Sequence, residues 1–366
     1  MNDYKNLLLI PKKSIPYTEE RDIITKFPIH RGQRKLLFLT LVFMIEISKN
    51  TKDGIIVYAG AATGKNLNIV IDLFPNFTYY LFDVNEFDKD LKNKSVICKF
   101  EERLNHKGNI FIFSEYFTNE KAAELEGSFL ISDIRTGENG KNDQSSIPYD
   151  MEIQKKWCQI MKPQLYMLKF RLPWKSGKTS YLNGVNYLQP RAKYDSAETR
   201  LIGSNLEEKE YDHDNYNNRI FYHNIVRRIK SHNVDVNIPG YCYCWDCAAE
   251  QNIIKEIEIL FPQINLIELY KKINKCSKIN IEPHILNRKN KNMRQRLLGI
   301  KNKIPSERVR YWKIVTPRIG RKVYITNDGN QIEVDKSFYI EGEIKTSDVM
   351  EKYNINLSTE EFNNLI

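Results

Sequence analysis

GIIVYAGAATG, residues 54–64, places four apolar or aromatic residues directly before a turn that contains Gly60 and Gly64. The apolar run predicts a short buried β-strand, and the sequence after the turn is typical of a helix. Glycine adopts unusual backbone angles without steric cost and lets a ligand approach the main chain closely. The stretch therefore predicts a strand-to-helix turn that can hold a nucleotide-like ligand.

Strand-like and helical runs alternate around this turn. We expect a mostly apolar helix at 33–48, strands at 55–58, 79–82, 110–113, 129–132 and 164–170, and helices at 65–73 and 151–161. Short apolar strands separated by helices predict an α/β fold, a parallel sheet with helices on both faces. Such sheets bind ligands at the carboxyl ends of their strands. Gly60, Asp83, Asp133 and Lys169 fall at or near these ends, so we expect the chemistry at one edge.

Composition and charge indicate a folded soluble protein with a basic segment. The 366 residues are 41% hydrophobic and 28% charged, and the net charge is +10. The N-terminus lacks an adequate signal-peptide core, and the longest apolar run, 36–45, is too short to span a bilayer. We therefore expect an intracellular protein without a membrane segment.

Three parts are expected along the chain. Residues 1–30 form an irregular segment with three prolines, 31–248 the main domain, and 249–366 an extension. Within the extension, residues 271–303 contain eleven Lys or Arg and one acid, a basic block dense enough for a polyanion partner. An amphipathic helix begins the extension, and NDGN, residues 327–330, predicts a hairpin turn.

Three of the six cysteines gather in CYCWDC as Cys242, Cys244 and Cys247. Zinc needs a fourth ligand, for which His232 and Cys276 are the candidates in the sequence. Small residues at the start of a partly buried helix explain the cluster more simply. We expect no metal, and scattered cysteines suit a reducing compartment.

The residues around the turn discriminate between three cofactors. A dinucleotide requires G-x-G-x-x-G, and a P-loop requires G-K-[ST], whereas Gly64 and Lys65 precede Asn66. Asp83, at the end of the next strand, can accept hydrogen bonds from both ribose hydroxyls of an adenosine. S-adenosylmethionine has no phosphate and needs only close backbone approach and this acid, so it fits best.

Six motifs between about residues 17 and 243 resemble one family. In chain order they are GQRKLLF, VYAGAATG, LISDIRTG, LKFRLPW, YLQPRAKYDSAETRL and YNNRIFYHNIVR. Together they resemble the poxvirus-type cap-specific mRNA 2′-O-methyltransferase, which is also the small subunit of a poly(A) polymerase. The resemblance implies a Rossmann-like methyltransferase sheet with a C-terminal extension. It also implies capped mRNA as partner, a possible poly(A) polymerase catalytic subunit, and the host cytoplasm and virion of a large DNA virus.

The resemblance implies a catalytic tetrad of Lys35, Asp133, Lys169 and Glu198. A ribose hydroxyl is a poor nucleophile that must lose its proton as it attacks a methyl group. A lysine accepts that proton only when nearby cations and desolvation lower its pKa. We expect Lys169 to be this base, with the acids orienting the two lysines. The supporting cations are Arg200 and Arg135.

The cofactor pocket is also carried over from the family by position. It comprises Gln33, Tyr58, Gly60, Ala62, Gly64, Asp83 and Asn85. Asn85 replaces an arginine of the family, so the contact there must differ. For the adenine edge we expect Tyr116 or Phe117, which follow the strand at 110–113.

The cap site is carried over as Tyr17, Trp174, Ser176 and Asn217. A cationic methylated guanine stacks well between two aromatic rings, which Tyr17 and Trp174 would provide. The family reads the guanine edge with two acids, but Ser176 and Asn217 stand at those positions. Either Asp212 or Asp214 substitutes, or cap specificity is weaker.

Two other functions remain in view. A non-catalytic RNA-binding subunit of a polyadenylation complex needs no tetrad, although both roles can coexist. A DNA base methyltransferase would carry [DN]-P-P-[YF] or a Pro-Cys nucleophile, and the sequence has neither. The leading interpretation is therefore a methyltransferase acting on the first transcribed nucleotide of capped mRNA.

Overall fold

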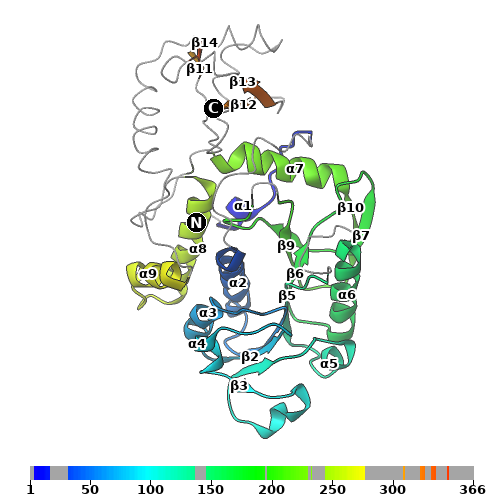
Figure 1. The fold of residues 1–366 in the computed structure, drawn as a ribbon, viewed down its shortest axis with the longest axis vertical. Helices are drawn as coiled ribbons and strands as arrows, with labels where there is room; N and C mark the ends of the chain where they lie inside the picture. Colours follow the sequence, from blue (N-terminus) through cyan, green and yellow to red (C-terminus); the bar gives the residue numbers. More distant parts are fainter. Residues whose placement is uncertain are drawn as a thin grey trace.

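The computed structural model describes residues 4–16, 32–136, 146–193, 196–229, 232 and 244–276, with four short strands between 308 and 345. One twisted sheet lies at its centre, with helices on either side (Figure 1). The N-terminal residue and the predicted hairpin turn at 327–330 lie outside the described residues.

The central sheet has eight strands in the order β3-β4-β2-β1-β5-β6-β9-β8. Their bounds are β1 (Gly54–Ala59), β2 (Phe77–Phe82), β3 (Val96–Ile97), β4 (Ile110–Phe113), β5 (Phe129–Ser132), β6 (Tyr166–Phe170), β8 (Val185–Tyr187) and β9 (Thr199–Gly203). The first six strands of the spatial order are parallel. Strand β9 runs antiparallel to them, and β8 pairs antiparallel with β9, so β8 runs in the direction of the first six. The α/β prediction is confirmed.

Two hydrophobic clusters cover the two faces of the sheet. Tyr58 of β1 faces a cluster built with α2 (Gly32–Ser48), α3 (Leu67–Leu73), α8 (Trp245–Leu260) and α9 (Leu266–Cys276). Val57, its neighbour on β1, faces the other cluster with α5 (Asn119–Ala123) and α6 (Ser146–Met161). Successive side chains of a strand point to opposite faces, so the continuous apolar strands are buried on both sides.

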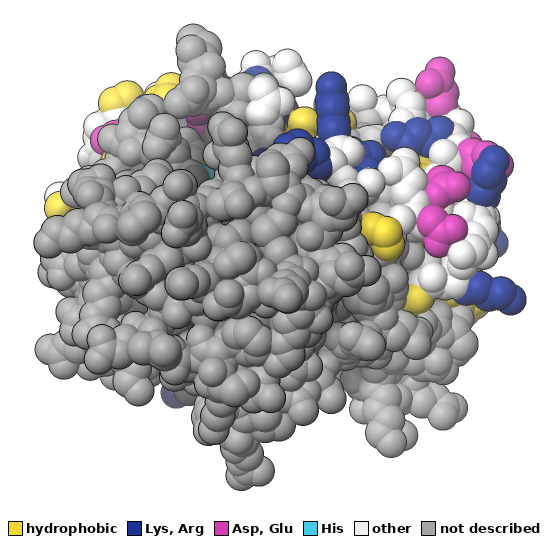
Figure 2. All heavy atoms as spheres, turned by 90° about the horizontal axis from the view of Figure 1, so that it is seen from above, with side chains coloured by type: hydrophobic (Ala, Val, Ile, Leu, Met, Phe, Trp, Pro, Cys, Tyr) yellow, Lys and Arg dark blue, Asp and Glu magenta, His cyan; other side chains and the backbone are white. Residues whose placement is uncertain are grey.

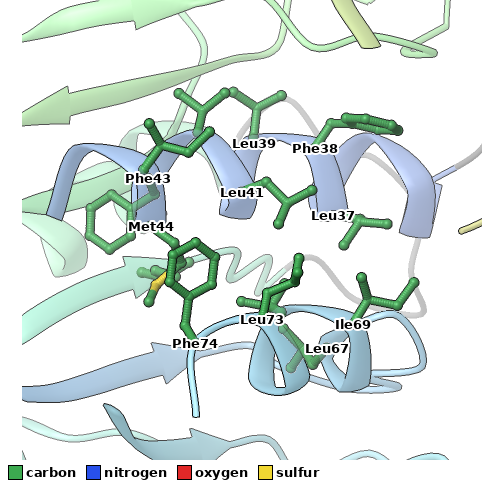
Figure 3. Close-up of a cluster of buried hydrophobic side chains, with 14 of the residues drawn as sticks. Leu37, Phe38, Leu39, Leu41, Phe43, Met44, Leu67, Ile69, Leu73 and Phe74 are labelled. Carbon is green, nitrogen blue, oxygen red and sulfur yellow. The ribbon is translucent and has the colours of Figure 1, made fainter. Parts of the chain in front are cut away.

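From residue 37 to residue 45, helix α2 is apolar on nearly all sides. Other helices pack against it on more than one side. All residues from 37 to 45 are buried. Figure 3 shows Leu37, Leu41 and Met44 pointing toward α3 and Phe74. Helix α8 packs on α2 from another direction. A helix that is hydrophobic on all sides must be buried, and its polar first turn is the part that reaches the site.

The expected boundary between residues 248 and 249 falls inside α8. Ala249, Ile253 and Ile257 of this helix are fully buried in the same cluster as α2. Leu269 and Ile273 of α9 join them there. Residues up to 276 are therefore built into the core around the sheet, since an amphipathic helix buries its apolar face against the nearest apolar surface.

Residues 4–16, which we call the N-terminal strap, run along α7 (His213–Ile225) and the edge of the sheet. The strap contains α1 (Tyr4–Leu8), and Leu9 forms a bridge with Tyr187 of β8. Arg219 donates to the carbonyl of Pro11 at 2.6 Å, and Arg227 donates to that of Leu9 at 2.7 Å. The strap is thus fixed through its main chain.

The remaining elements lie around this core. They are α4 (Lys89–Lys92), the 3₁₀ helices Phe100–Asn105 and Arg227–Ile229, the paired strands β7 (Lys178–Leu182) and β10 (Glu208–Asp212), and β11 (Arg308–Val309), β12 (Lys322–Ile325), β13 (Gln331–Val334) and β14 (Ile344–Lys345). Strands β12 and β13 pair antiparallel on either side of the predicted turn.

The surface seen in Figure 2 mixes both signs of charge where residues are described. At the right of that view, lysine and arginine side chains lie beside aspartate and glutamate. Most of the basic block lies outside the described residues. None of the described helices combines the length and hydropathy needed to cross a membrane.

Candidate active site

The strand register brings the predicted catalytic residues to one edge of the sheet. Ala59 of β1 pairs with Ser132 of β5, so Gly60 and Asp133 follow side by side. Ser132 in turn pairs with Leu168 of β6, which puts Lys169 next to Asp133. Strand β9 is antiparallel to β6, so its beginning lies at the carboxyl end of β6. Glu198 therefore enters the same edge from the opposite direction.

The four residues of the predicted tetrad form ion pairs with one another. Lys35, in the first turn of α2, donates from Nζ to Glu198 Oε1 at 2.7 Å. Lys169 Nζ lies 3.0 Å from Asp133 Oδ1 and 3.7 Å from Glu198 Oε2. Each of the four side chains is 13–15% exposed. The tetrad is therefore largely desolvated yet open to a reactant.

Both predicted supporting arginines contact the tetrad. Arg200, only 1% exposed, donates to Asp133 Oδ1 at 2.7 Å and lies 3.4 Å from Glu198 Oε1. Arg135 bridges Glu198 Oε2 at 3.3 Å and Asp150 at 3.2 Å. With the tetrad, Arg135, Asp150 and Arg200 form what we call the Glu198 cluster. Its four cations and three carboxylates leave one excess positive charge, which favours loss of one lysine proton.

Burial and charge act in opposite directions on the pKa values here. Burial, and secondarily Arg200, lower the pKa of Lys35 despite the attraction of Glu198. Burial by itself would raise the pKa of Asp133, but Arg200 and then Lys169 outweigh it, so the pKa is lowered. The pKa of Glu198 lies well below its ordinary value, because Lys35, Lys169 and Arg200 outweigh burial. Both acids are thus held ionised.

Two glutamines complete the site, and the sequence reading missed both as site residues. Gln189 donates to Glu198 Oε1 at 3.1 Å and accepts from Arg200 Nε at 3.0 Å. Gln154 of α6 accepts from the Lys169 main-chain N–H and donates to its carbonyl, both at 3.1 Å. Gln154 interrupts the apolar face of α6, and a buried polar residue on such a face was the available signal.

Gly60 fits the turn for a reason specific to its surroundings. Its φ is +80°, and a Cβ there would lie 3.0 Å from the carbonyl carbon of Asp133. Gly64 has a φ of +65°. Side chains strain such a backbone, and at Gly60 one would also collide with main chain. The turn therefore packs directly against the strand end that carries Asp133.

The expected ribose acid is oriented by main-chain groups. Asp83 accepts hydrogen bonds from Ala62 N at Oδ2 and from Asn85 N at Oδ1, both at 2.9 Å. The side chain of Asn85 donates to the same Oδ1. Asn85 therefore orients Asp83 in this structure. Because Asp83 is only half-buried, its remaining lone pairs stay accessible.

Tyr58 packs on the side of the turn that faces α2, and Gln33 belongs to the first turn of this helix. Tyr58 is 3% exposed and packs in the same cluster as this helix. Burial and then the charge of Asp133 raise the pKa of Tyr58, and Asp83 acts in the same direction. Its phenol is therefore close enough to both Asp133 and Asp83 for their charges to affect it. Gln33, half-buried, precedes Lys35 by two residues.

The two candidates for the adenine edge differ in exposure. Phe117 is buried and packs against Phe82 and Trp157, with ring centroids 5.0 and 4.9 Å apart. Tyr116 is 71% exposed. Phe117 thus belongs to the core, and Tyr116 is the one with a free ring face.

The predicted cap residues gather where the loop after β6 meets the first turns of α7. Asn217 is 3% exposed and donates to the carbonyl of Pro173 at 2.9 Å. Ser176 donates to Asp214 Oδ1 at 3.0 Å. Trp174, which lies between Pro173 and Ser176 in the sequence, is partly buried and packs on the second cluster. Tyr17 lies outside the described residues.

Asp212 and Asp214, the two acids considered as replacements at the cap site, differ in their surroundings. Asp212 caps α7 and accepts from Asn215 N at 2.7 Å. Asp214 is exposed and lies one helical turn before Asn217, on the same side of α7. Asp214 therefore places a carboxylate beside Ser176 and on the same side of α7 as Asn217.

The cysteine cluster lies at the start of α8. Cys244 precedes the helix, and buried Cys247 accepts a hydrogen bond from Arg191 at 3.2 Å, whereas Cys242 is outside the described residues. Within the part of the chain that the structure describes, no group of three or more His, Cys, Asp or Glu could hold a metal ion.

The fold and the site define a doubly wound α/β protein with a charged cluster at the carboxyl edge of its sheet, beside a glycine turn. The chain belongs to the family described as "Poly A polymerase regulatory subunit", which matches residues 4–281. This agrees with the resemblance seen in the sequence.

Comparison with individual proteins gives three likenesses. A curated relative, the "Cap-specific mRNA (nucleoside-2'-O-)-methyltransferase" of Fowlpox virus (strain NVSL), is 31% identical over 191 residues, covering 49% of this chain and 59% of the relative. The solved structure of bluetongue virus VP4, titled as an RNA-capping production line, is 14% identical over 59% of this chain and 38% of that chain, with a TM-score of 0.36. Precorrin-6y C5,15-methyltransferase from Geobacter metallireducens is 13% identical over 51% of this chain and 92% of that chain, with a TM-score of 0.24. The two structural likenesses are too distant to carry an argument.

Proposed function

We propose that the protein is an S-adenosylmethionine-dependent methyltransferase that acts on the ribose 2′-hydroxyl of the first transcribed nucleotide of capped mRNA. The observation that carries this proposal is the Lys169–Asp133 pair, 3.0 Å apart, beside the turn at Gly60. The name of the Fowlpox virus relative, of which this chain covers 59%, supports it.

The residues of the turn fit the cofactor. Asp83 is oriented by two main-chain N–H groups and keeps accessible lone pairs, as a ribose acceptor requires. Gly60 and Gly64 leave the main chain open to close approach. We assign Gln33, Tyr58 and Ala62 to the same pocket by their positions around the turn. When bound, S-adenosylmethionine supplies a methyl group activated by its sulfonium centre.

The chain's own residues would then handle the proton. Lys169 Nζ accepts the proton of the 2′-hydroxyl as that oxygen becomes a nucleophile. Asp133 and Glu198 hold the lysine in place by ion pairs. Lys35 and Arg200 add positive charge beside the two carboxylates that pair with Lys169. Arg135 and Gln189 keep Glu198 in the orientation that this arrangement needs.

We assign recognition of the cap to the site at α7. Trp174 and Tyr17 would stack on the methylated guanine, whose positive charge strengthens stacking on electron-rich rings. Asp214 would accept hydrogen bonds from the guanine edge in place of the two missing acids, with Ser176 and Asn217 shaping the pocket. The basic block at 271–303 would contact RNA phosphates, and we propose the host cytoplasm and virion of a large DNA virus as its location.

The test measures transfer to matched RNAs. The protein is incubated with methyl-labelled S-adenosylmethionine and with one short RNA in capped and uncapped forms. Nuclease digestion then maps the label. We expect label only in the capped RNA, on the ribose of its first transcribed nucleotide. Equal labelling of both RNAs would contradict cap specificity, and absence of label from both would refute the activity.

The family description favours a second function that can coexist with the first. We propose that the chain also binds RNA as the non-catalytic subunit of a poly(A) polymerase. Its partner would be a catalytic subunit. Copurification with that subunit and longer poly(A) products in its presence would support this role, and unchanged tail length would contradict it.

A further inference from the structure

One buried carboxylate was not among the residues predicted for the site. Glu250 of α8 is fully buried. Arg34 donates to both of its oxygens at 2.7 Å, from Nε and Nη2. Arg191 donates to the same two oxygens at 3.0 and 3.3 Å. Two guanidinium groups thus converge on one carboxylate out of contact with water.

Further buried groups extend this network. Asn274 of α9 accepts from Arg34 at 2.8 Å. Asp246 accepts from the main-chain N–H of Arg191 at 2.7 Å and from two nitrogens of Arg228 at 2.9 Å. We call Arg34, Arg191, Arg228, Asp246, Glu250 and Asn274 the Glu250 cluster. All six are 6% exposed or less.

The Glu250 cluster and the Glu198 cluster hold the same two segments of chain. In the first turn of α2, Lys35 reaches Glu198 and its neighbour Arg34 reaches Glu250. In the loop after β8, Gln189 reaches Glu198 and Arg191 reaches Glu250. Each segment is therefore fixed by two glutamates, one of which belongs to the proposed catalytic site.

Helix geometry explains why this matters for Lys35. Consecutive helical residues are about 100° apart around the axis, so Arg34 and Lys35 leave α2 in different directions. A planar guanidinium bonded to both oxygens of a carboxylate fixes orientation as well as distance. The bond to Glu250 therefore restrains rotation of the first turn, on which the direction of Lys35 depends.

We propose that Glu250 is a positioning residue for methyl transfer, which holds α2 and the loop after β8 so that Lys35 and Gln189 both meet Glu198. This inference rests on the proposed function. It assigns a role in the reaction to α8, part of which lies beyond the domain boundary expected from the sequence. Glu250 acts through Arg34 and Arg191, which both donate to its two oxygens.

The first test replaces the carboxylate with its isosteric amide. We expect Glu250→Gln to lower kcat about tenfold to a hundredfold at saturating cofactor and RNA, because small displacements of catalytic groups have effects of this size. The KM values for both substrates should stay within about threefold, since Asp83 and Trp174 are held by other contacts. An unchanged kcat in the folded variant would overturn the proposal.

A matched control separates positioning from simple loss of stability. Phe100→Leu weakens the core of the second cluster, where this ring packs against Tyr80, Phe82 and Phe113. Both variants are assayed well below their Tm values, and the control should keep wild-type kcat. An equal loss of kcat in the control would overturn the positioning role. If Glu250→Gln does not fold, Arg34→Lys keeps the buried charge but loses the bidentate contact, and the same fall in kcat is expected.

A readout without activity keeps this inference distinct from the proposed function. We expect Glu250→Gln to speed amide hydrogen exchange about tenfold or more in residues 32–36 and 188–192, and Phe100→Leu to leave both segments unchanged. If the wild-type protein transfers no methyl group, the proposed function fails, while this exchange still tests the restraint. Unchanged exchange in Glu250→Gln would refute the inference even in an active enzyme.

Discussion

The Glu198 cluster and the Glu250 cluster contain similar groups but differ in cation type and exposure. The Glu198 cluster includes two lysines, and its tetrad keeps 13–15% exposure. The Glu250 cluster contains only arginines as cations, and Glu250 has no contact with solvent. Arginine stays protonated in proteins, whereas a lysine can give up its proton. The first cluster can therefore transfer a proton, and the second can only fix geometry.

The largest expected effect breaks the first cluster at its proton acceptor. Lys169→Ala should lower the rate of methyl transfer about a thousandfold, within the range of general base catalysis. Lys169→Arg keeps a cation beside Asp133 but cannot accept a proton, so it should be equally inactive. Single-turnover rates at saturating cofactor measure both. A Lys169→Arg variant with more than a tenth of wild-type activity would remove Lys169 as the base.

The second effect concerns acid stability and the Glu250 cluster. Burial would raise the pKa of Glu250, but Arg191 and then Arg34 outweigh it and bring the pKa to about 2. Because the folded-state pKa lies below that of the unfolded chain, the unfolded state binds more protons between these values. The ionised group therefore contributes about 3 kcal/mol above roughly pH 4.5, and this is lost as the pH falls toward 2.

Urea unfolding of wild type and Glu250→Gln at several pH values measures this contribution. The wild-type advantage should shrink by about 3 kcal/mol between pH 5 and pH 2. All other acids are common to both proteins, so the difference isolates Glu250. Parallel curves for the two proteins would show that Glu250 is not held ionised.

The carboxylate of Asp83 extends the comparison, because main-chain N–H groups hold it in place of cations. Asp83→Ala should weaken S-adenosylmethionine binding by about 1.5–3 kcal/mol for each charged hydrogen bond lost, or at least about tenfold. Asp83→Asn keeps an acceptor for Ala62 N and should lose less. Calorimetry measures both affinities. Equal affinity in wild type and Asp83→Ala would place the ribose elsewhere.

The smallest expected effect tests whether the loop after β6, which follows Lys169 in the sequence, binds the cap. Trp174→Ala should weaken binding of a methylated cap analogue by about 1–3 kcal/mol, the range for loss of one stacking partner. Tryptophan fluorescence or competition binding measures the change. Trp174→Phe keeps a ring and should lose less. A cap analogue that binds Trp174→Ala as well as wild type would remove this loop from the cap site.

The strands and the edge of the sheet were predictable because their signal is local. Strands β4 and β5 begin and end where their apolar runs do, and each is buried on both faces. Asp133 directly follows one apolar run, and Lys169 lies near the end of the next one. Because the strands are parallel, the two residues are predicted to be neighbours. Lys35 and Glu198 came from the family resemblance, since α2 and β9 reach the edge through tertiary packing.

The Glu250 cluster was not predictable, because its signal is not local. Glu250 stands in EQNIIKEIEILF, where its charge looks like that of any exposed glutamate on an amphipathic helix. Its partners Arg34 and Arg191 are 216 and 59 residues away. A single sequence cannot distinguish a buried glutamate with remote partners from a solvated one. The domain boundary expected between residues 248 and 249 was misplaced inside α8 for the same reason. The core contacts of α8 are made with α2, which is remote in the sequence.

The hydrogen bonds that fix the N-terminal strap have a consequence for which of its residues can be substituted. Arg219 and Arg227 grip carbonyl oxygens, and so does Trp245, which donates to that of Leu7 at 2.9 Å. Every amino acid carries this oxygen, proline included, and Pro11 is one of the residues held. The strap can therefore exchange its exposed side chains while keeping its path along α7. Substitutions at these exposed positions are therefore compatible with an unchanged course of the chain that leads toward Tyr17.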